Sequence, residues 1–146
     1  METVVLPTTR ASGHTDTQRK EVFRAVKVLV VDDSPIFLAA ATAFLSRYPQ
    51  IQVVGRAQSG REAIQLVAEV SPDLVLMDVR MPQMNGLEAT QRIKAQPAPP
   101  RVIILTLHDS PDCRESAQTV GADGFIAKDE FGDNLPSAIF SLFSFA

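Results

Sequence analysis

The chain has 146 residues, of which 45% are hydrophobic and 21% charged, and its formal net charge is -3 at pH 7. This composition argues against a disordered chain, and the acidic balance argues against a protein that binds nucleic-acid phosphates through a basic face. The lone cysteine, Cys113, excludes an internal disulfide, and no apolar run reaches the roughly 18 residues of a membrane span. Since the N-terminus also lacks the apolar core of a signal peptide, we expect a cytoplasmic protein.

The N-terminal segment differs in composition from the rest of the chain. Residues 7–20 are polar, rich in turn formers and without a sustained apolar period. We therefore expect a flexible N-terminal tail over residues 1–25 and one folded domain over residues 26–146. His14, inside this tail, has no second candidate ligand beside it and is predicted to be a solvated loop residue.

The folded part is predicted to open with a strand that is followed by two acidic residues. Residues 27–31 form a largely β-branched apolar run, and Asp32 and Asp33 follow it at once. Ser34 then supplies a helix N-cap, with Pro35 at the first helical position, where its missing N–H costs nothing. Apolar residues spaced three and four apart predict one buried helix face, made of Phe37, Ala41, Phe44, Leu45 and Tyr48.

The same alternation of strand and helix recurs along the rest of the chain. Ser59 and Glu62 form a capping-box pattern at the start of the second helix. The last helix is predicted to begin near Gly132 or Asp133, because Pro136 is tolerated only in a first turn. The further strands are predicted at residues 51–57, 73–78, 101–106 and 124–127, and the further helices at 59–70, 87–95, 110–120 and from 132 or 133 through 143.

Five strand and helix units of this kind predict an α/β fold, a doubly wound five-stranded parallel sheet with helices on both faces. In such a sheet the carboxyl ends of the strands meet at one edge. The third strand holds four consecutive apolar residues, predicted to be buried on both faces, and delivers Asp78 to that edge. Asp32 and Asp33 leave the first strand, Thr106 the fourth and Lys128 the fifth. All five polar side chains are therefore expected to gather there.

Three carboxylates dominate the residues expected at this edge. Clustered carboxylates repel one another, and in water-poor surroundings they take up protons or recruit a cation. A hard divalent ion with oxygen ligands, Mg2+, is the natural partner. A Mg2+ ion, a carboxylate nucleophile, a hydroxyl group and an ammonium ion together suit phosphoryl transfer through an aspartyl phosphate.

At these residues the chain resembles the receiver domain of bacterial two-component response regulators. The resemblance covers about residues 26–144 and implies a flavodoxin-like fold with strand order 2-1-3-4-5. It also implies a phosphoacceptor signalling domain rather than an enzyme with a separate substrate. The motifs that carry the resemblance, in the family's order and spacing, are Val30-Val31-Asp32-Asp33, Leu76-Met77-Asp78-Val79-Arg80-Met81-Pro82, Asn85-Gly86, Thr106 and Lys128.

The resemblance implies a role for each acidic residue of the set. Asp78 would be the phosphoacceptor, taking a phosphoryl group from a histidine kinase or a histidine phosphotransfer protein. Asp33, Asp78 and the backbone carbonyl of Arg80 would bind Mg2+ directly, whereas Asp32 would act mainly through a water molecule. The implied cofactor is therefore Mg2+ alone.

The resemblance also implies which residues bind the phosphoryl group, switch the surface and tune dephosphorylation. Lys128 would pair with the phosphate, and Thr106 would swing its hydroxyl group toward it. Phe125 takes the place of the family's switch aromatic, and because it lacks a tyrosine hydroxyl its switching would depend on packing alone. Arg80 and His108 occupy the positions at which the family tunes dephosphorylation, where their bulk would alter the access of water.

The output surface is expected on the fourth helix, the fifth strand and the last helix, to be read by a protein partner or by a second copy. Phe140, Phe143 and Phe145 crowd the C-terminus. Some of them are expected in the core, but a helix with this many aromatic residues is also expected to show an apolar surface, which suits dimerisation or docking. Residues 121–129 are most similar to the subfamily that usually carries a C-terminal helix-turn-helix domain. The chain ends at Ala146, right after the last helix, so we expect a single-domain regulator without direct nucleic-acid contact.

Two other functions match parts of the pattern. A hydrolase of the haloacid dehalogenase type also uses a Mg2+-bound aspartate nucleophile at a strand end, but it places an acid two residues later. Ser34 and Arg80 stand at that distance from Asp32 and Asp78. An adaptor that docks without phosphorylation is the second alternative, and the intact acidic set argues against it. Nucleotide binding is disfavoured because the chain has neither a GxGxxG pattern nor a P-loop.

Overall fold

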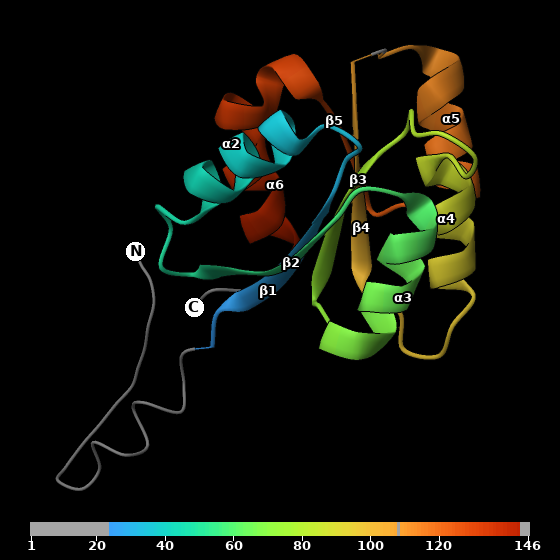
Figure 1. The fold of residues 1–146 in the computed structure, drawn as a ribbon. Helices are drawn as coiled ribbons and strands as arrows, with labels where there is room; N and C mark the ends of the chain where they lie inside the picture. Colours follow the sequence, from blue (N-terminus) through green and yellow to red (C-terminus); the bar gives the residue numbers. More distant parts are fainter. Residues whose placement is uncertain (1–23, 108, 144–146) are drawn as a thin grey trace, which may run out of the picture.

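The computed structural model describes residues 24–107 and 109–143, so the predicted tail lies outside the described residues except for Arg24 and Ala25. One parallel sheet of five strands, in the order β2-β1-β3-β4-β5, forms the centre and confirms the predicted topology (Figure 1). The strands are β1 (Val26–Val31), β2 (Ile51–Ala57), β3 (Leu74–Asp78), β4 (Arg101–Thr106) and β5 (Gly124–Ala127). The helices are α2 (Pro35–Leu45), α3 (Gly60–Val70), α4 (Gly86–Lys94), α5 (Pro111–Thr119), the short 3-10 helix η1 (Lys128–Glu130) and α6 (Phe131–Leu142).

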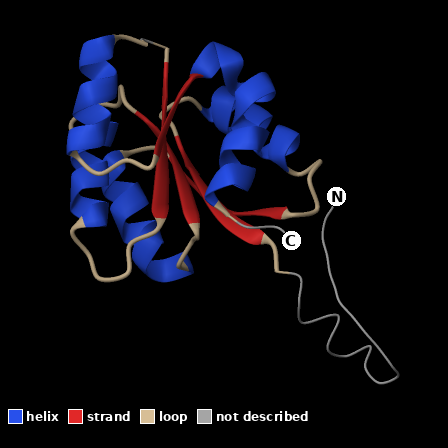
Figure 2. Cartoon of the chain, turned by 180° about the vertical axis from the view of Figure 1, so that it is seen from behind, coloured by secondary structure: helices blue, strands red, loops and turns tan. Residues whose placement is uncertain are grey.

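Helices cover both faces of the sheet and create two hydrophobic cores. In Figure 1 and in the reverse view of Figure 2, α2 and α6 lie on one face, and α3, α4 and α5 lie on the other. Side chains alternate along the strands: Val28, Val30 and Leu76 belong to the core beneath α2 and α6. Leu29 and Met77 belong to the core on the opposite face. Strand β3 is buried along its whole length, as predicted for a strand between two helical layers.

The helix starts follow the capping residues that the sequence predicts. Ser34, Ser59 and Ser110 are N-caps, and each hydroxyl oxygen accepts a hydrogen bond from the backbone N–H three residues later. The capping box differs in one detail. The Glu62 carboxylate accepts a hydrogen bond from the N–H of Gln58 and not from the N–H of the N-cap, Ser59. These caps fix the first helical turns close to the ends of the strands that precede them.

The last helix starts earlier than predicted. The 3-10 turn η1 leads directly into α6 at Phe131, and Pro136 lies inside this helix rather than in its first turn. The Phe131 ring packs edge-on against Phe37 and Phe44, with centroid distances of 5.6 and 5.2 Å. This packing stabilises the start of the helix. It offsets the loss of the hydrogen bond that residue 136 would donate to the Gly132 carbonyl if it were not proline.

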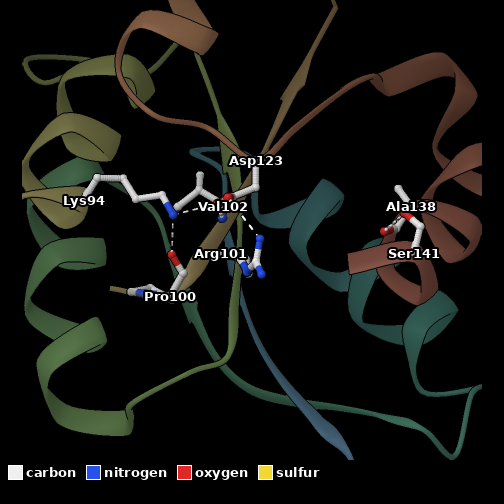
Figure 3. Close-up of polar contacts among 7 residues, drawn as sticks. All are labelled: Lys94, Pro100, Arg101, Val102, Asp123, Ala138 and Ser141. Carbon is white, nitrogen blue, oxygen red and sulfur yellow. Dashed lines mark hydrogen bonds and ion pairs between the residues drawn. The ribbon is translucent and has the colours of Figure 1, made fainter. Parts of the chain in front are cut away.

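Asp123 ties together the edge of the sheet opposite the acidic strand ends (Figure 3). Its carboxylate lies 2.6 Å from the Lys94 ammonium, accepts from the Val102 N–H at 2.9 Å and lies 3.4 Å from the Arg101 guanidinium. Lys94 also donates to the carbonyl of Pro100 at 2.9 Å. The end of α4, the start of β4 and the turn before β5 are therefore held in place at the far ends of the strands that carry site residues.

The aromatic residues described near the C-terminus pack on the core, as expected for some of them. Phe140 and Phe143 are partly buried against the core beneath α2 and α6, and Phe145 lies outside the described residues. Among residues 24–107 and 109–143, the exposed large apolar side chains are Ile36, 83% exposed, and Leu107, 71% exposed. Within the same ranges, none of the helices combines the length and the apolar character that a membrane crossing requires.

Candidate functional site

The strand ends bring Asp32, Asp33 and Asp78 together. Asp78 is the last residue of β3, and the two other acids follow β1, whose register sets Val31 beside Met77. One carboxylate oxygen from each of the three acids lies within 4.8 Å of the others. Asp32 and Asp78 are buried, whereas Asp33 is exposed, so the cluster meets solvent on one side.

Lys128 is the counter-ion of this cluster. It directly follows β5, and its Nζ lies 2.5 Å from Oδ2 of Asp32 and 3.3 Å from Oδ1 of Asp78. Its side chain is only 13% exposed, so bulk water screens these ion pairs weakly. When all groups are ionised, three carboxylates and one ammonium ion leave two excess negative charges, which matches the charge of a divalent cation.

Burial shifts the pKa values of Asp78 and Lys128. Desolvation raises the pKa of Asp78 from 3.8 to about 6, an effect that the charge of Asp32 increases and that Lys128 opposes. Burial lowers the pKa of Lys128, but its hydrogen bond with Asp32 and the nearby carboxylate charges outweigh burial and raise the pKa overall. At neutral pH the Asp78 carboxyl group is therefore mostly ionised and poorly solvated, a state that suits a nucleophile.

Backbone contacts fix the surroundings of the two buried acids, Asp32 and Asp78. Oδ1 of Asp32 accepts a hydrogen bond from the N–H of Ser34 at 2.9 Å, so Asp32 also supports the turn into α2. Gly86, the first residue of α4, lies directly against the strand end that carries Asp78. A Cβ atom at Gly86 would stand 1.9 Å from the carbonyl oxygen of Asp78, so the approach of α4 to this strand requires glycine.

Thr106 and Lys128 reach the same edge from neighbouring strands. Thr106 is the buried last residue of β4 and lies in register with Ala127, the residue before Lys128. Phe125, earlier on β5, is half-buried, and the guanidinium carbon of Arg114 lies 4.6 Å from the centroid of its ring. The hydroxyl and the aromatic ring of the predicted set thus come from the adjacent strands β4 and β5, and the ammonium ion comes from the residue directly after β5.

The donor set fits Mg2+. Carboxylate oxygens are the ligands that this ion prefers, and the exposed side of Asp33 leaves room for the water ligands that it retains. Arg80 lies two residues beyond Asp78 with an exposed side chain, and the role of its carbonyl as a ligand stays a prediction. His108 lies outside the described residues, so its predicted tuning role also stays a prediction.

Two side chains make contacts at the site that the sequence pattern does not single out. The pattern assigns Phe37 to a buried helix face, yet its ring centroid lies 4.4 Å from Nζ of Lys128. Arg114 has no predicted role, yet it lies over Phe125. The contact between Phe37 and Lys128 joins residues far apart in the chain. The sequence could have indicated this contact only through the position of Phe37. It lies in the first helical turn after the acidic strand end, where a large ring can reach the site.

Known proteins show where the chain belongs. The model of the response regulator receiver domain family matches residues 28–140. The chain is 42% identical over 106 residues to the protein-glutamate methylesterase/protein-glutamine glutaminase of Geobacillus kaustophilus (strain HTA426), a match that covers 72% of this chain and 30% of that protein. It is 32% identical over 112 residues to the nitrate/nitrite response regulator protein NarL of Escherichia coli (strain K12), which covers 77% of this chain and 52% of NarL.

The fold gives the same result. The solved signal receiver domain of the response regulator NarL from Mycobacterium tuberculosis matches with a TM-score of 0.77 and 33% identity, covering 82% of this chain and 96% of that one. The chain spans about half or less of the length of the two curated relatives above. Family match, strand order and acidic edge agree, and the chain belongs to the receiver domain family of two-component response regulators.

Proposed function

We propose that this protein accepts a phosphoryl group on Asp78 from a histidine kinase or a histidine phosphotransfer protein, in a Mg2+-dependent reaction in the cytoplasm. The observation that carries the proposal is the buried Asp78 carboxylate, which ends the central strand beside Asp32, Asp33 and Lys128. The responsible unit is assigned to residues 26–146, after an N-terminal tail. Its own phosphorylation and dephosphorylation are the only reactions assigned to it.

Asp33, Asp78 and the carbonyl of Arg80 would hold Mg2+ directly, and Asp32 would hold it through water. The close approach of the three carboxylates supports this assignment, as does the excess of negative charge around them. When bound, Mg2+ neutralises the charge that spreads over the phosphoryl oxygens during transfer. The exposed Asp33 lies on the side from which the ion and the phosphodonor can approach.

In the transfer step, an oxygen of the Asp78 carboxylate attacks the phosphorus atom of a phosphohistidine or of acetyl phosphate. A bond from this oxygen to phosphorus forms while the bond to the histidine nitrogen, or to the acetate oxygen, breaks. The leaving group keeps the electron pair of the broken bond. The Lys128 ammonium, already 3.3 Å from Oδ1 of Asp78, is close enough to pair with the transferred phosphoryl oxygens.

Phosphorylation adds about 1.5 to 2 negative charges at this edge of the sheet. The hydroxyl group of Thr106 would turn toward the phosphoryl group, and Phe125 would repack in response. The register between Thr106 and Ala127 supports this coupling, because it joins the end of β4 directly to β5. The surface of α5, β5 and α6 would then change for a protein partner or a second copy. Direct binding of nucleic acid or membrane is not part of the proposal.

Incubation with acetyl phosphate and Mg2+, followed by intact-mass spectrometry, tests this function. We expect a mass gain of one phosphoryl group in the wild type and in Asp112→Asn, which alters an exposed acid on α5, and none in Asp78→Asn. No gain in the wild type, together with no binding of beryllofluoride, would overturn the proposal in favour of a phosphorylation-independent adaptor. Sustained release of phosphate from small phosphate esters would instead favour a hydrolase.

A further inference from the structure

We propose that Phe37 is a positioning residue for Lys128, and that its aromatic face holds the ammonium ion where the phosphoryl group of Asp78 will need it. This inference rests on the proposed function and deepens it. The Phe37 ring centroid lies 4.4 Å from Nζ of Lys128, well within the range of a cation–π contact. The ammonium ion is thus bounded by two carboxylates and one aromatic face.

Four contacts close a ring around this arrangement. The N–H of Ser34 donates to Oδ1 of Asp32 at 2.9 Å, and the N–H of Phe37 donates to the hydroxyl oxygen of Ser34 at 3.2 Å. The Phe37 ring contacts the Lys128 ammonium, and this ammonium forms an ion pair with Oδ2 of Asp32. The cap of α2, the metal-site carboxylate and the ammonium ion are therefore linked through Phe37.

A second aromatic residue supports the Phe37 ring. Phe131 packs against it nearly perpendicularly, with 5.6 Å between centroids and 77° between planes. Phe131 begins α6 immediately after η1, the 3-10 turn that Lys128 opens, so the support and the supported ion belong to one short segment.

The physical role of the ring is to restrict a flexible cation. A lysine ammonium sits on a four-carbon stem with several rotatable bonds, and ordering it costs conformational entropy. An aromatic face attracts the ion without accepting its hydrogen bonds, so the donors stay directed at the carboxylates and at the phosphoryl oxygens that replace them. The contact also occupies the side of the ion where water would otherwise lie.

A fluorination series at position 37 tests this inference in the full chain. Mono-, di- and trifluorophenylalanine keep the shape of the ring while they progressively weaken its attraction for a cation. The affinity for beryllofluoride with Mg2+, measured by titration calorimetry, should fall stepwise by about 3- to 10-fold in total. The affinity for Mg2+ alone should not fall, because carboxylates rather than the ammonium ion bind the metal.

The same substitutions at Phe44 provide the matched control. Phe44 lies on the same helix and packs on Phe131 with 5.2 Å between centroids, so it shares the packing environment of Phe37. We expect no stepwise loss of beryllofluoride affinity there. In the metal-free protein, NMR should show a ring-current shift of the Lys128 Cε protons that Phe37→Leu removes and Phe37→Tyr retains.

The outcomes separate this inference from the function on which it rests. A wild type that binds no beryllofluoride would overturn the proposed function and this inference with it. A wild type that binds beryllofluoride, with a flat series at position 37, would overturn the positioning role alone. Equal losses at positions 37 and 44, or a parallel loss of Mg2+ affinity, would also overturn it, because they would show a packing effect.

Discussion

The guanidinium carbon of Arg114 lies 4.6 Å from the centroid of the Phe125 ring. The same guanidinium donates two hydrogen bonds to the carboxylate of Asp109, at 2.7 and 2.9 Å, and so links α5 to the loop after β4. This hydrogen bonding lowers the pKa of Asp109 and raises the pKa of Arg114. Arg114 therefore stabilises the observed positions of both the loop and the proposed switch residue.

Replacement of Arg114 by glutamine should make the activated form easier to reach. Without the cation over its ring, Phe125 repacks at a lower cost, so beryllofluoride with Mg2+ should bind about 2- to 5-fold more tightly. Titration calorimetry measures this change. Arg61→Gln alters an exposed arginine on α3 and should leave the affinity unchanged. Weaker or unaltered binding by Arg114→Gln would contradict a restraining role for Arg114.

The buried Asp78 carboxyl group should make the metal-free stability depend on pH. Its pKa is raised from 3.8 to about 6 in the folded protein, so the folded state binds this proton more tightly than the unfolded chain. The associated stability is fully present below pH 3.8 and is lost as the pH rises through about 6. At about pH 7.5, Asp78→Asn should therefore exceed the wild type by up to about 3 kcal/mol in unfolding free energy.

Urea unfolding in EDTA measures this difference at two pH values. The advantage of Asp78→Asn should shrink to about 1 kcal/mol near pH 4.5, where the folded wild type is already protonated. An equal advantage at both pH values would show that the buried charge of Asp78 is not its cause.

Mg2+ should stabilise the folded protein, because the unfolded chain does not assemble the three carboxylates. At a concentration about 100 times the dissociation constant, the gain should be about 2.7 kcal/mol, and EDTA should reverse it. Asp33→Asn should reduce the gain, whereas Glu115→Gln, at an exposed position on α5, should retain it. Thermal unfolding with and without the ion measures both, and full stabilisation of Asp33→Asn would exclude Asp33 as a ligand.

Gly86→Ala should destabilise the protein by about 2–3 kcal/mol, because overpacking forces the backbone to shift. The added Cβ would meet the Asp78 carbonyl oxygen at 1.9 Å and its carbon at 2.8 Å. Gly132→Ala is the matched control, since the nearest atom to its Cβ, on Phe44, lies 3.9 Å away. Denaturant unfolding distinguishes the two variants, and equal stability would contradict the close approach of α4 to β3.

Much of the fold could be predicted because its local signals agree with its tertiary structure. The strands at residues 51–57, 101–106 and 124–127 have the predicted bounds. Helix α6 starts at Phe131, one residue before the predicted Gly132, but Pro136 lies inside the helix and not in its first turn. The rule for Pro136 is local, whereas the aromatic packing that holds this helix start is tertiary.

The candidate site likewise has features that the sequence predicts and features that it does not predict. The convergence of Asp32, Asp33 and Asp78 follows from strand alternation and parallel topology, and the structure brings the three together. The contact between Phe37 and Lys128 could not be predicted, because it depends on the rotation of α2 and on the path of η1. Helical periodicity shows that Phe37 faces inward, but it does not show which atoms it meets.

The most direct test of the account is the position of the phosphoryl group. After incubation with acetyl phosphate and Mg2+, borohydride reduction converts an aspartyl phosphate into homoserine, which peptide mass spectrometry can locate. We expect homoserine at position 78 in the wild type, and none there when Mg2+ is replaced by EDTA. Homoserine at another acidic position, or none in a wild type that binds beryllofluoride and gains the phosphoryl mass, would contradict the assignment of Asp78.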